Sequence, residues 1–354
     1  MTGKRSLQTF LAVCIGLLAS MVVAAAAGEQ PFLLPQVLWG SLFSSWFSFG
    51  TVLSYAVPLS LTGLSVAIAF RAGLFNIGAE GQMVIGAVVA SGLGLHTLGL
   101  PPIVHWALVG ISAFIAGGAW SLFAGWIRVA RGGHEVITTI MMNYLAMAIG
   151  NWVAVDLFPN PQSQSAETLP ILPQLLFSPI PLFDEAPVTW LGLIPILLAL
   201  FAHFIFDRTV WGFETLAAGS NAAACPSAGI DFGRRKIEAM ALAGGMAGLA
   251  GFIAVYGYQG SFRVGFSPGY GFMGITVAFL AACHPLGTFP SALLLALLHK
   301  GTMDLELESE LLTRDLASFI QAIMVVAVAA PWLSGRWSRL LGKPLSSGLG
   351  KRHA

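Results

Sequence analysis

The sequence predicts an all-α, polytopic membrane protein, a bundle of about ten transmembrane helices with an inverted-topology internal repeat. Three observations lead to this fold class. Hydrophobic residues make up 56% of the 354 residues and charged residues only 9%, against about 25% charged in soluble proteins. Long apolar runs separate the few charges, and one glycine-rich segment occurs twice. A soluble protein of this length would need a far more charged surface, so a soluble fold is excluded.

Runs without charged residues set the expected number of helices, because a helix needs about 20 apolar residues to cross a bilayer. Five of the runs fit one span each. The runs of 47 and 36 residues are interpreted as two spans apiece, with breaks at 96–102 and at His284-Pro285. The run of 41 residues is interpreted as one span near 51–70 behind an interfacial stretch rich in Trp and Phe. The runs, which together predict ten spans, are 6–28, 30–70, 81–127, 136–155, 186–206, 239–262, 264–299 and 316–335.

Lysine and arginine predict the orientation of the spans, because cytoplasmic loops carry an excess of both. With ten spans and the N-terminus inside, 14 of the 17 Lys and Arg residues face the cytoplasm, and the exceptions are Arg263, Lys300 and Arg314. Both termini are therefore expected in the cytoplasm. The net charge of +1 provides no basic surface for nucleic acid, so a nucleic-acid partner is excluded.

The first 28 residues allow two interpretations. Lys4 and Arg5, an apolar run and four alanines at 24–27 are typical of a cleavable signal peptide. The apolar run is longer than the core of about 7–15 residues that signal peptides use, so we expect a retained first span. Cleavage would remove one span and leave the orientation of the others unchanged.

A short motif and the glycines behind it occur twice. Residues 70–73 (FRAG) and 262–265 (FRVG) each precede a glycine-rich stretch and a similar helix start. The charge distribution places the first copy inside and the second outside, as in the inverted repeats of transporters. Chance similarity between glycine-rich membrane segments is the alternative. The expected organisation is an N-terminal span and interfacial segment (1–50), a first repeat (51–155), an outside loop, span and cytoplasmic loop (156–236), a second repeat (237–335) and a cytoplasmic basic tail (336–354).

The segment 75–82 (FNIGAEGQ) interrupts apolar sequence with glycines and three polar side chains. Irregular chain at membrane depth is tolerated only where protein or a wet cavity covers it. Asn76, Glu80 and Gln82 supply donors and acceptors for a hydroxyl-rich or heterocyclic solute, and an intramembrane acid is a functional-site hypothesis by default. The alternative places this stretch at the cytoplasmic end of its span, where Glu80 pairs with Arg71. We favour a role in the substrate pathway.

Further pathway candidates come from other spans. Asn143 lies within the span 136–155, where Asn more often binds neighbouring helices together than contacts a solute. Tyr270 and Phe272 lie in the second glycine-rich copy and either stack on a planar ring or pack as ordinary aromatic residues. No His has a second His or an acid at metal-ligand spacing, so no metal site is expected.

The segment 207–236 is the longest expected cytoplasmic loop and carries little charge for a solvated loop. Small residues on a short helix permit close docking into a groove on a partner, and Asn221 is a suitable N-cap for a following helix. The chain has neither a phosphate-binding G-x-x-x-x-G-K-[ST] loop nor a Ser, His and acid constellation. It is therefore not expected to be an enzyme, and ATP hydrolysis that drives transport would occur in another polypeptide. The docking candidates are Glu214, Ala218, Gly219, Asn221 and Gly229.

Four motifs together carry a resemblance to a known family. They are 70–82 (FRAGLFNIGAEGQ), 135–144 (EVITTIMMNY), 266–272 (FSPGYGF) and 284–287 (HPLG). On these motifs the chain resembles, over most of 50–335, the permease subunits of bacterial ABC importers for nucleosides and simple sugars, kin of the ribose and branched-chain amino-acid permeases.

The resemblance implies an inner-membrane importer with two permeases, often two different chains, and ATP-binding subunits that hold ATP and Mg²⁺. The resemblance further implies a periplasmic or lipid-anchored solute-binding protein. The segment 207–236 is similar to the segment of these permeases that contacts the ATPase. Two departures stand out. Met273 occupies a position where family members often carry an acid, and Pro226 would shorten or kink a helix that starts after Asn221.

The resulting expectation is a permease subunit that moves a nucleoside inward by alternating access, with no cofactor in this chain. A permease for a simple sugar such as ribose is the first alternative, because a nucleoside and a free pentose present the same hydroxyls. A proton- or sodium-coupled carrier that works alone is the second. The scarcity of intramembrane acids available for ion binding disfavours it.

Overall fold

The computed structural model describes residues 16–26, 28–30, 32–96, 99–309, 319–320, 322–323 and 326. The chain forms two compact units, one of residues 1–37 with 302–354 and one of residues 38–301. In the first unit, the Ser309 hydroxyl donates a hydrogen bond to the Glu29 carboxylate. The second unit contains the elements that carry every candidate residue of the sequence analysis.

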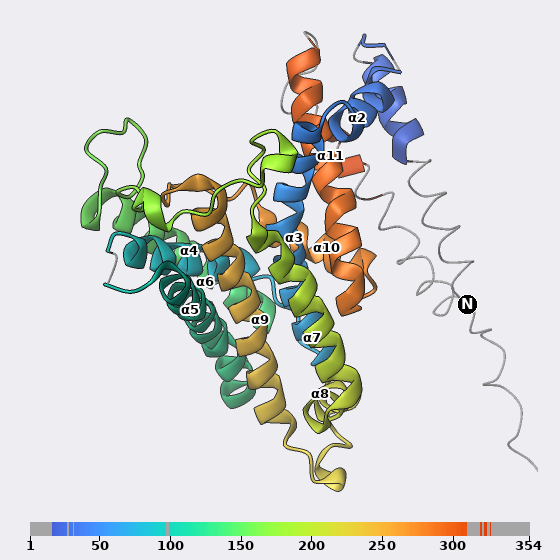
Figure 1. Ribbon diagram of the computed structural model, residues 1–354. Coiled ribbons are helices and arrows are strands. Elements are labelled where there is room, and N and C mark those ends of the chain that lie inside the picture. Colours follow the sequence, from blue (N-terminus) through green and yellow to red (C-terminus); the bar gives the residue numbers. More distant parts are fainter. Residues whose placement is uncertain are drawn as a thin grey trace, which may run out of the picture. The chain divides into compact units, whose positions relative to one another are not determined.

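The described residues are mostly helical, with only isolated bridges in place of strands, which confirms the all-α prediction (Figure 1). Two long helices, α6 and α9, each continue into a π-helical turn, at Val153–Leu157 and Val255–Gln259. The helices are α2 (Leu33–Phe43), α3 (Trp46–Arg71), α4 (Ala79–Gly94), α5 (Pro102–Arg131), α6 (Glu135–Trp152), α7 (Ile194–Arg208), α8 (Val210–Ser220), α9 (Phe232–Ala254), α10 (Tyr270–Leu280) and α11 (Thr288–Glu308).

Five helical segments among the described residues are long and apolar enough to cross a membrane. They match the predicted spans near 51–70, 102–127, 136–155, 186–206 and 239–262. The run 264–299, interpreted as two spans, forms instead a pair of helices, α10 and α11, bent by 117° at the 3-10 turn Pro285–Gly287, which is the geometry of one broken span or a re-entrant loop.

The prediction of ten spans differs from this count for two reasons. Helix α4 has 16 residues, so at 1.5 Å per residue it extends only about 24 Å, because the glycine-rich break before it delays its start. The predicted spans 6–28 and 316–335 lie partly or mostly outside the described residues.

Helix α9 is the central packing element of the second unit and contacts α3, α4 and α5; α5 and α9 run side by side in Figure 1. Glycines bring these helices into backbone contact. A Cβ atom on Gly248 would lie 2.3 Å from the carbonyl oxygen of Ala113, and one on Gly86 would lie 2.2 Å from that of Gly248. Small residues that allow such approach are how helices associate in membranes, where lipid removes the hydrophobic driving force.

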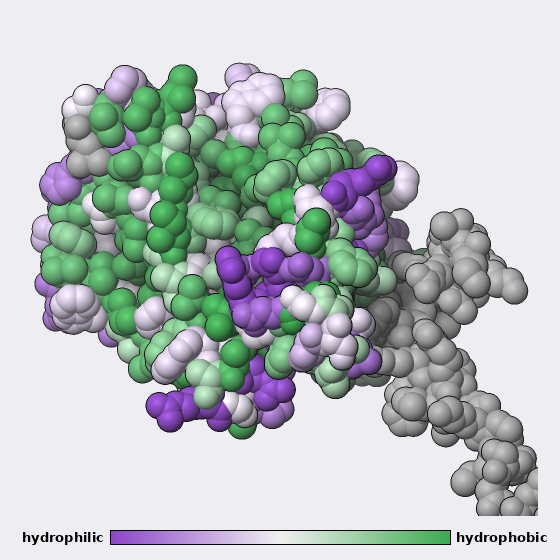
Figure 2. All heavy atoms as spheres, turned by 90° about the horizontal axis from the view of Figure 1, so that it is seen from below, coloured by the Kyte–Doolittle hydropathy of each residue, from purple (hydrophilic) through white to green (hydrophobic). Residues whose placement is uncertain are grey.

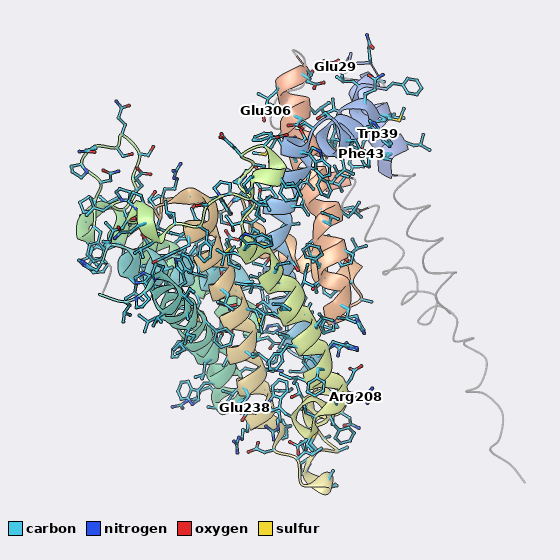
Figure 3. The ribbon with its side chains drawn as sticks, viewed as in Figure 1. Glu29, Trp39, Phe43, Arg208, Glu238 and Glu306 are labelled. Atoms are coloured by element: carbon cyan, nitrogen blue, oxygen red, sulfur yellow. The ribbon has the colours of Figure 1, made fainter. Side chains whose placement is uncertain are left out.

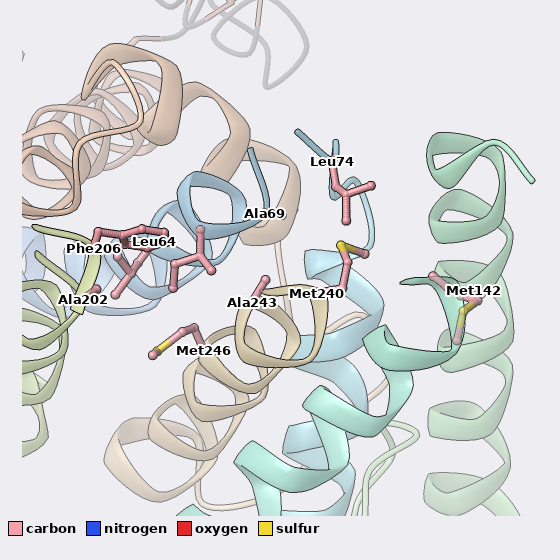
Figure 4. Close-up of a cluster of buried hydrophobic side chains, with 11 residues drawn as sticks. Leu64, Ala69, Leu74, Met142, Ala202, Phe206, Met240, Ala243 and Met246 are labelled. Atoms are coloured by element: carbon pink, nitrogen blue, oxygen red, sulfur yellow. The ribbon is translucent and has the colours of Figure 1, made fainter. Parts of the chain in front are cut away.

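An apolar cluster fills the space between α3, α6, α7 and α9 (Figure 4). Its larger members are Leu64, Met142, Phe206, Met240 and Met246, and alanines fill the positions between them. Methionine adapts its shape to irregular gaps, which suits a core enclosed by helices that cross at different angles.

The loop 158–189 is attached to the connection between α9 and α10. Backbone amides of Thr168 and Ile171 donate to the carbonyl oxygens of Phe262 and Gly260, each at 2.8 Å. Glu167 lies 3.5 Å from the Arg263 guanidinium. Burial raises the pKa of Glu167, but hydrogen bonds from Ser163, Asn160 and Ser261 and the Arg263 charge outweigh it and hold the pKa below its ordinary value.

The two copies of the repeated motif share a backbone feature only at their last residue, because Phe70 and Arg71 belong to α3 whereas Arg263 forms an isolated bridge. Gly73 and Gly265, the last residues of the two motifs, have φ angles of +72° and +73°. The first copy includes the end of α3, the second follows the π-helical turn after α9, and the shorter helices α4 and α10 come next. The internal repeat stays a prediction.

Substituting Gly248 with Ala tests the backbone packing of α9. The added methyl group would lie 2.3 Å from the Ala113 carbonyl oxygen, so we expect a loss of about 1–3 kcal/mol in stability. The matched control is Gly92→Ala on α4, where the nearest atom lies 3.8 Å from the new Cβ. Thermal unfolding of the purified protein in detergent compares the two, and equal unfolding temperatures would contradict the proposed packing.

Candidate functional site

Residues 72–78 form a break between α3 and α4 that is largely buried, with Gly73 exposed. Arg71 ends α3, and the amide of Gly73, in the left-handed conformation, donates to the Phe70 carbonyl oxygen at 3.0 Å. Glycine adopts this conformation without the steric cost of a Cβ. The Asn76 side chain behind the turn is fully buried. The part of the break around Asn76 is therefore covered by protein, as irregular backbone within a membrane requires.

Asn76 and Gln82 pair their side-chain amides within this break. Asn76 Nδ2 donates to Gln82 Oε1, and Gln82 Nε2 donates to Asn76 Oδ1, both at 2.9 Å. Asn76 Oδ1 also accepts from the Gly78 amide at 2.9 Å, and its Nδ2 donates to the Ser65 hydroxyl at 3.2 Å. The two predicted pathway residues thus satisfy one another and fix the start of α4.

Glu80 joins the N-terminal ends of two helices. It lies in the first turn of α4, is 3% exposed, and its Oε2 accepts a hydrogen bond from the amide of Gly271 in the first turn of α10 at 2.6 Å. Carboxylates are stabilised at helix N-termini by unpaired amides and the helix dipole. Gly271 is required here because a Cβ would lie 2.2 Å from the Glu80 nitrogen.

The alternative pairing of Glu80 with Arg71 is wrong. Arg71 Nε donates to the carbonyl oxygen of Cys283 at 3.0 Å, and its Nη1 lies 4.0 Å from the Asp207 carboxylate. Because the chain turns at the break, the side chains of Arg71 and Glu80 contact different elements although they are close in sequence.

Asn143 on α6 also binds the start of α4. Its Oδ1 accepts from the Gly81 amide at 2.9 Å, and its Nδ2 donates to the Ile77 carbonyl oxygen at 3.0 Å. Both bonds complete backbone groups that the break and the helix start leave without partners. Asn143 thus joins two helices, as Asn does within many membrane spans.

The two aromatic candidates differ in environment. Tyr270 is 2% exposed, and its ring lies 6.5 Å from that of Tyr55 and 6.3 Å from that of His299. Phe272 is 45% exposed. The backbone oxygen of Tyr270 accepts from the Thr62 hydroxyl at 2.9 Å, which fixes α10 to α3.

Sequence reasoning missed Tyr55, Thr62, Gly271 and His299 as neighbours of this site. The repeat was the signal for Gly271, because it places a helix start there that corresponds to the one at Glu80. No local pattern in the sequence singles out the other three.

The predicted docking residues lie on or just after α8, which contacts the break directly. A Cβ on Gly219 would lie 2.2 Å from the Arg71 carbonyl oxygen and 2.8 Å from the Gly73 nitrogen. Ala218 is buried in a small cluster with Cys225 and Ile230. The end of α8 is therefore in backbone contact with the turn that leads to Asn76 and Glu80.

Ion pairs fix α8 to α9. Arg235 Nε lies 2.5 Å from Glu214 and its Nη1 lies 2.6 Å from Glu238, whose carboxylate also accepts from the indole nitrogen of Trp211 at 2.8 Å. Glu238 and Arg208 lie towards the lower ends of α9 and α7 in Figure 3, and Figure 2 shows hydrophilic side chains gathered on the face seen from below.

The helix predicted after Asn221 does not form. Asn221 instead follows the last residue of α8, and its Oδ1 accepts from the Ala224 amide at 3.2 Å within a turn. Pro226 starts a short 3-10 turn that ends at Gly229, whose φ of +70° requires a residue without a Cβ. The segment between Ser220 and Pro226 is too short for a helix.

Known proteins resemble this chain over most of its length. The guanosine ABC transporter permease NupP of Bacillus subtilis is 31% identical, over 92% of this chain and 93% of its own. The nucleoside permease NupB of Lactococcus lactis is 32% identical over 84% of each chain. The glucose permease TsgB13 of Haloferax volcanii is 30% identical, over 89% of this chain and 85% of its own.

Among solved structures, an inward-facing metal-chelate type ABC transporter covers 91% of this chain with a TM-score of 0.46 and 14% identity, which is too little likeness to carry a conclusion. The family match is decisive, because it covers residues 48–329. The chain belongs to the family of permease components of branched-chain amino acid transport systems.

Proposed function

We propose that the chain is the permease subunit of an ATP-binding-cassette importer and that it moves nucleosides inward by alternating access. The similarity to the guanosine and nucleoside permeases, over 92% and 84% of this chain, carries this proposal. The glucose permease, at 30% identity, keeps a simple sugar as the second candidate. An ion-coupled carrier is disfavoured because these relatives are all ABC transporter permeases.

The junction of α4 and α10 is the proposed moving part of the pathway. Two short helices meet there through the bond between Glu80 and Gly271, and neither helix extends across a bilayer by itself. The backbone at the start of α4 is fixed by the hydrogen bonds of Asn76, Gln82 and Asn143. Tyr270, at the start of α10, and the partly exposed Phe272 complete the proposed pathway, where aromatic rings suit a planar base.

The proposed route of the driving motion runs through α8. An ATP-binding subunit, which holds ATP and Mg²⁺, would contact the face formed by α8 and the turn that follows it, from Glu214 to Gly229. Because Gly219 touches Gly73 through backbone atoms, displacement of α8 would move the break and thus the junction at Glu80.

The other partners and the location follow from the same proposal. The chain would lie in a bacterial inner membrane with both termini in the cytoplasm, beside a second, homologous permease. A periplasmic or lipid-anchored binding protein would deliver the nucleoside to the opposite side.

Uptake of labelled guanosine by cells expressing the complete importer tests the solute class. We expect uptake that an excess of unlabelled inosine suppresses and that the same excess of ribose or glucose leaves unchanged. Uptake of labelled ribose or glucose without guanosine uptake would contradict the proposal and assign the chain to sugar transport. Collapse of the membrane potential at constant ATP should leave guanosine uptake unchanged, whereas an ion-coupled carrier would stop.

Glu80→Gln tests the junction between α4 and α10. The variant retains an acceptor oxygen but loses the charge-assisted bond to Gly271, and hydrogen bonds to charged groups contribute about 1.5–3 kcal/mol. We expect guanosine uptake to fall about tenfold or more, since each tenfold step corresponds to about 1.4 kcal/mol, while the complex still assembles. The control is Asp156→Asn, because Asp156 is exposed at the end of α6. Wild-type uptake by Glu80→Gln would contradict the assignment.

Glu214→Gln tests the coupling route. Losing the ion pair with Arg235 removes one of the contacts that fix α8 to α9, so we expect the complex to hydrolyse ATP while moving fewer solute molecules per ATP, with an unchanged KM for guanosine. Arg131→Gln removes an exposed charge from the end of α5 and serves as the control. An unchanged ratio of transport to hydrolysis in Glu214→Gln would show that this contact is not part of the coupling route.

A further inference from the structure

A cavity of about 280 Å³ lies between the end of α9 and the loop that precedes α7. Residues 176–187 line one side and residues 256–260 line the other. The charge distribution of the sequence places both segments at the outside of the membrane. The volume is close to the lower end of the roughly 300–1,000 Å³ found for small-molecule sites, which suits a solute of one or two rings.

The wall of this cavity contains a fixed aromatic platform. Phe177 packs against Trp106 with ring centroids 4.1 Å apart, and the Trp106 indole nitrogen donates to the Leu175 carbonyl oxygen at 2.8 Å. Tyr258 lines the cavity from the opposite segment. Planar rings gain binding energy when they pack against aromatic side chains, so this wall favours a flat heterocycle.

The polar groups that line the cavity discriminate between solutes by their charge. Glu185 is the one acidic residue among those that line the cavity, and no Lys or Arg joins it there. Such a wall accepts a neutral, hydrogen-bonding solute and repels a phosphate. Gln259 Nε2 donates to the Phe266 carbonyl oxygen at 3.1 Å, whereas its buried Oε1 accepts no hydrogen bond from the described residues. A buried acceptor without a partner is uncommon in proteins.

Two irregular backbone segments build the cavity. The π-helical turn at the end of α9 closes through the bond from the Gly260 amide to the Val255 carbonyl oxygen at 2.9 Å, and such turns are frequent at functional sites. On the facing loop, Asp184 and Glu185 both adopt positive φ angles, +48° and +63°. Residues other than glycine rarely adopt this backbone conformation. At Glu185 it places the residue in the wall of the cavity.

We propose that this cavity is an entry subsite for the heterocyclic base of the solute and that it admits nucleosides but rejects nucleotides. The inference rests on the proposed transport of nucleosides and assigns the base to one place in the chain. A second cavity of only about 10 Å³ shares Pro187, Gly257 and Tyr258 with the first and continues to Ser54 on α3. It has room for about one water molecule, so the route from the subsite is closed to the solute in this conformation.

The subsite is connected to the junction of α4 and α10 by neighbouring tyrosines. The hydroxyl of Tyr258 lies next to that of Tyr270, and Tyr270 directly precedes Gly271, the partner of Glu80. Opening of the narrow second cavity would therefore occur beside the contact that joins the two short helices.

Gly257→Val in the complete importer tests the subsite. A Cβ at Gly257 would lie in ordinary contact with Thr189, Leu191 and Ile253, at 3.5–3.9 Å, so the two further methyl groups of Val narrow the passage between the subsite and the second cavity, which Thr189 and Ile253 line. We expect the KM for guanosine to rise about tenfold, as one extra methylene in a binding pocket does, with an unchanged amount of assembled complex. Gly92→Val is the matched control, since a Cβ there has its nearest neighbour at 3.8 Å and does not line the cavity.

Glu185→Gln tests charge selection without adding volume. We expect unlabelled guanosine monophosphate to become a measurable competitor of guanosine uptake, because the repelling carboxylate is gone. An unchanged KM in Gly257→Val together with unchanged exclusion of the monophosphate in Glu185→Gln would overturn the subsite. Absence of guanosine uptake by the wild-type importer would instead contradict the nucleoside assignment, so the two failures are distinguishable.

Discussion

The hydrogen bond between the Glu80 carboxylate and the Gly271 amide is the contact on which the site depends. It joins the starts of α4 and α10, two helices too short to cross a bilayer separately. Both helix starts present unpaired amides and positive dipole ends, which would repel each other across a low-dielectric interior. A carboxylate between them compensates both, and the absence of a side chain at Gly271 permits the approach.

The remaining polar groups of the site complete this arrangement. Asn76 pairs with Gln82 inside the break, and Asn143 supplies the donor and acceptor that Gly81 and Ile77 need. Each buried polar atom without a partner would destabilise the fold. These bonds explain how a chain with so few charges maintains an irregular segment within an apolar bundle.

The sequence was sufficient for the fold class and for the irregular break between α3 and α4. Gaps between charges gave the five long spans, and glycines among polar residues marked the break at 72–78. Contacts between distant segments could not be predicted in the same way. The partner of Glu80 is a backbone amide 191 residues away, which leaves no side-chain signal. Asn221 was misassigned because its residue type suits a helix N-cap and a turn equally well.

The contact between Gly73 and Gly219 involves backbone on both sides. Because no side chain takes part, substitutions elsewhere can change which molecules are recognised without altering the proposed linkage. Recognition, in the proposed arrangement, depends on side chains at the opposite end of the bundle. Related chains with this arrangement can therefore differ in the solute that they transport while the proposed linkage between α8 and the break stays the same.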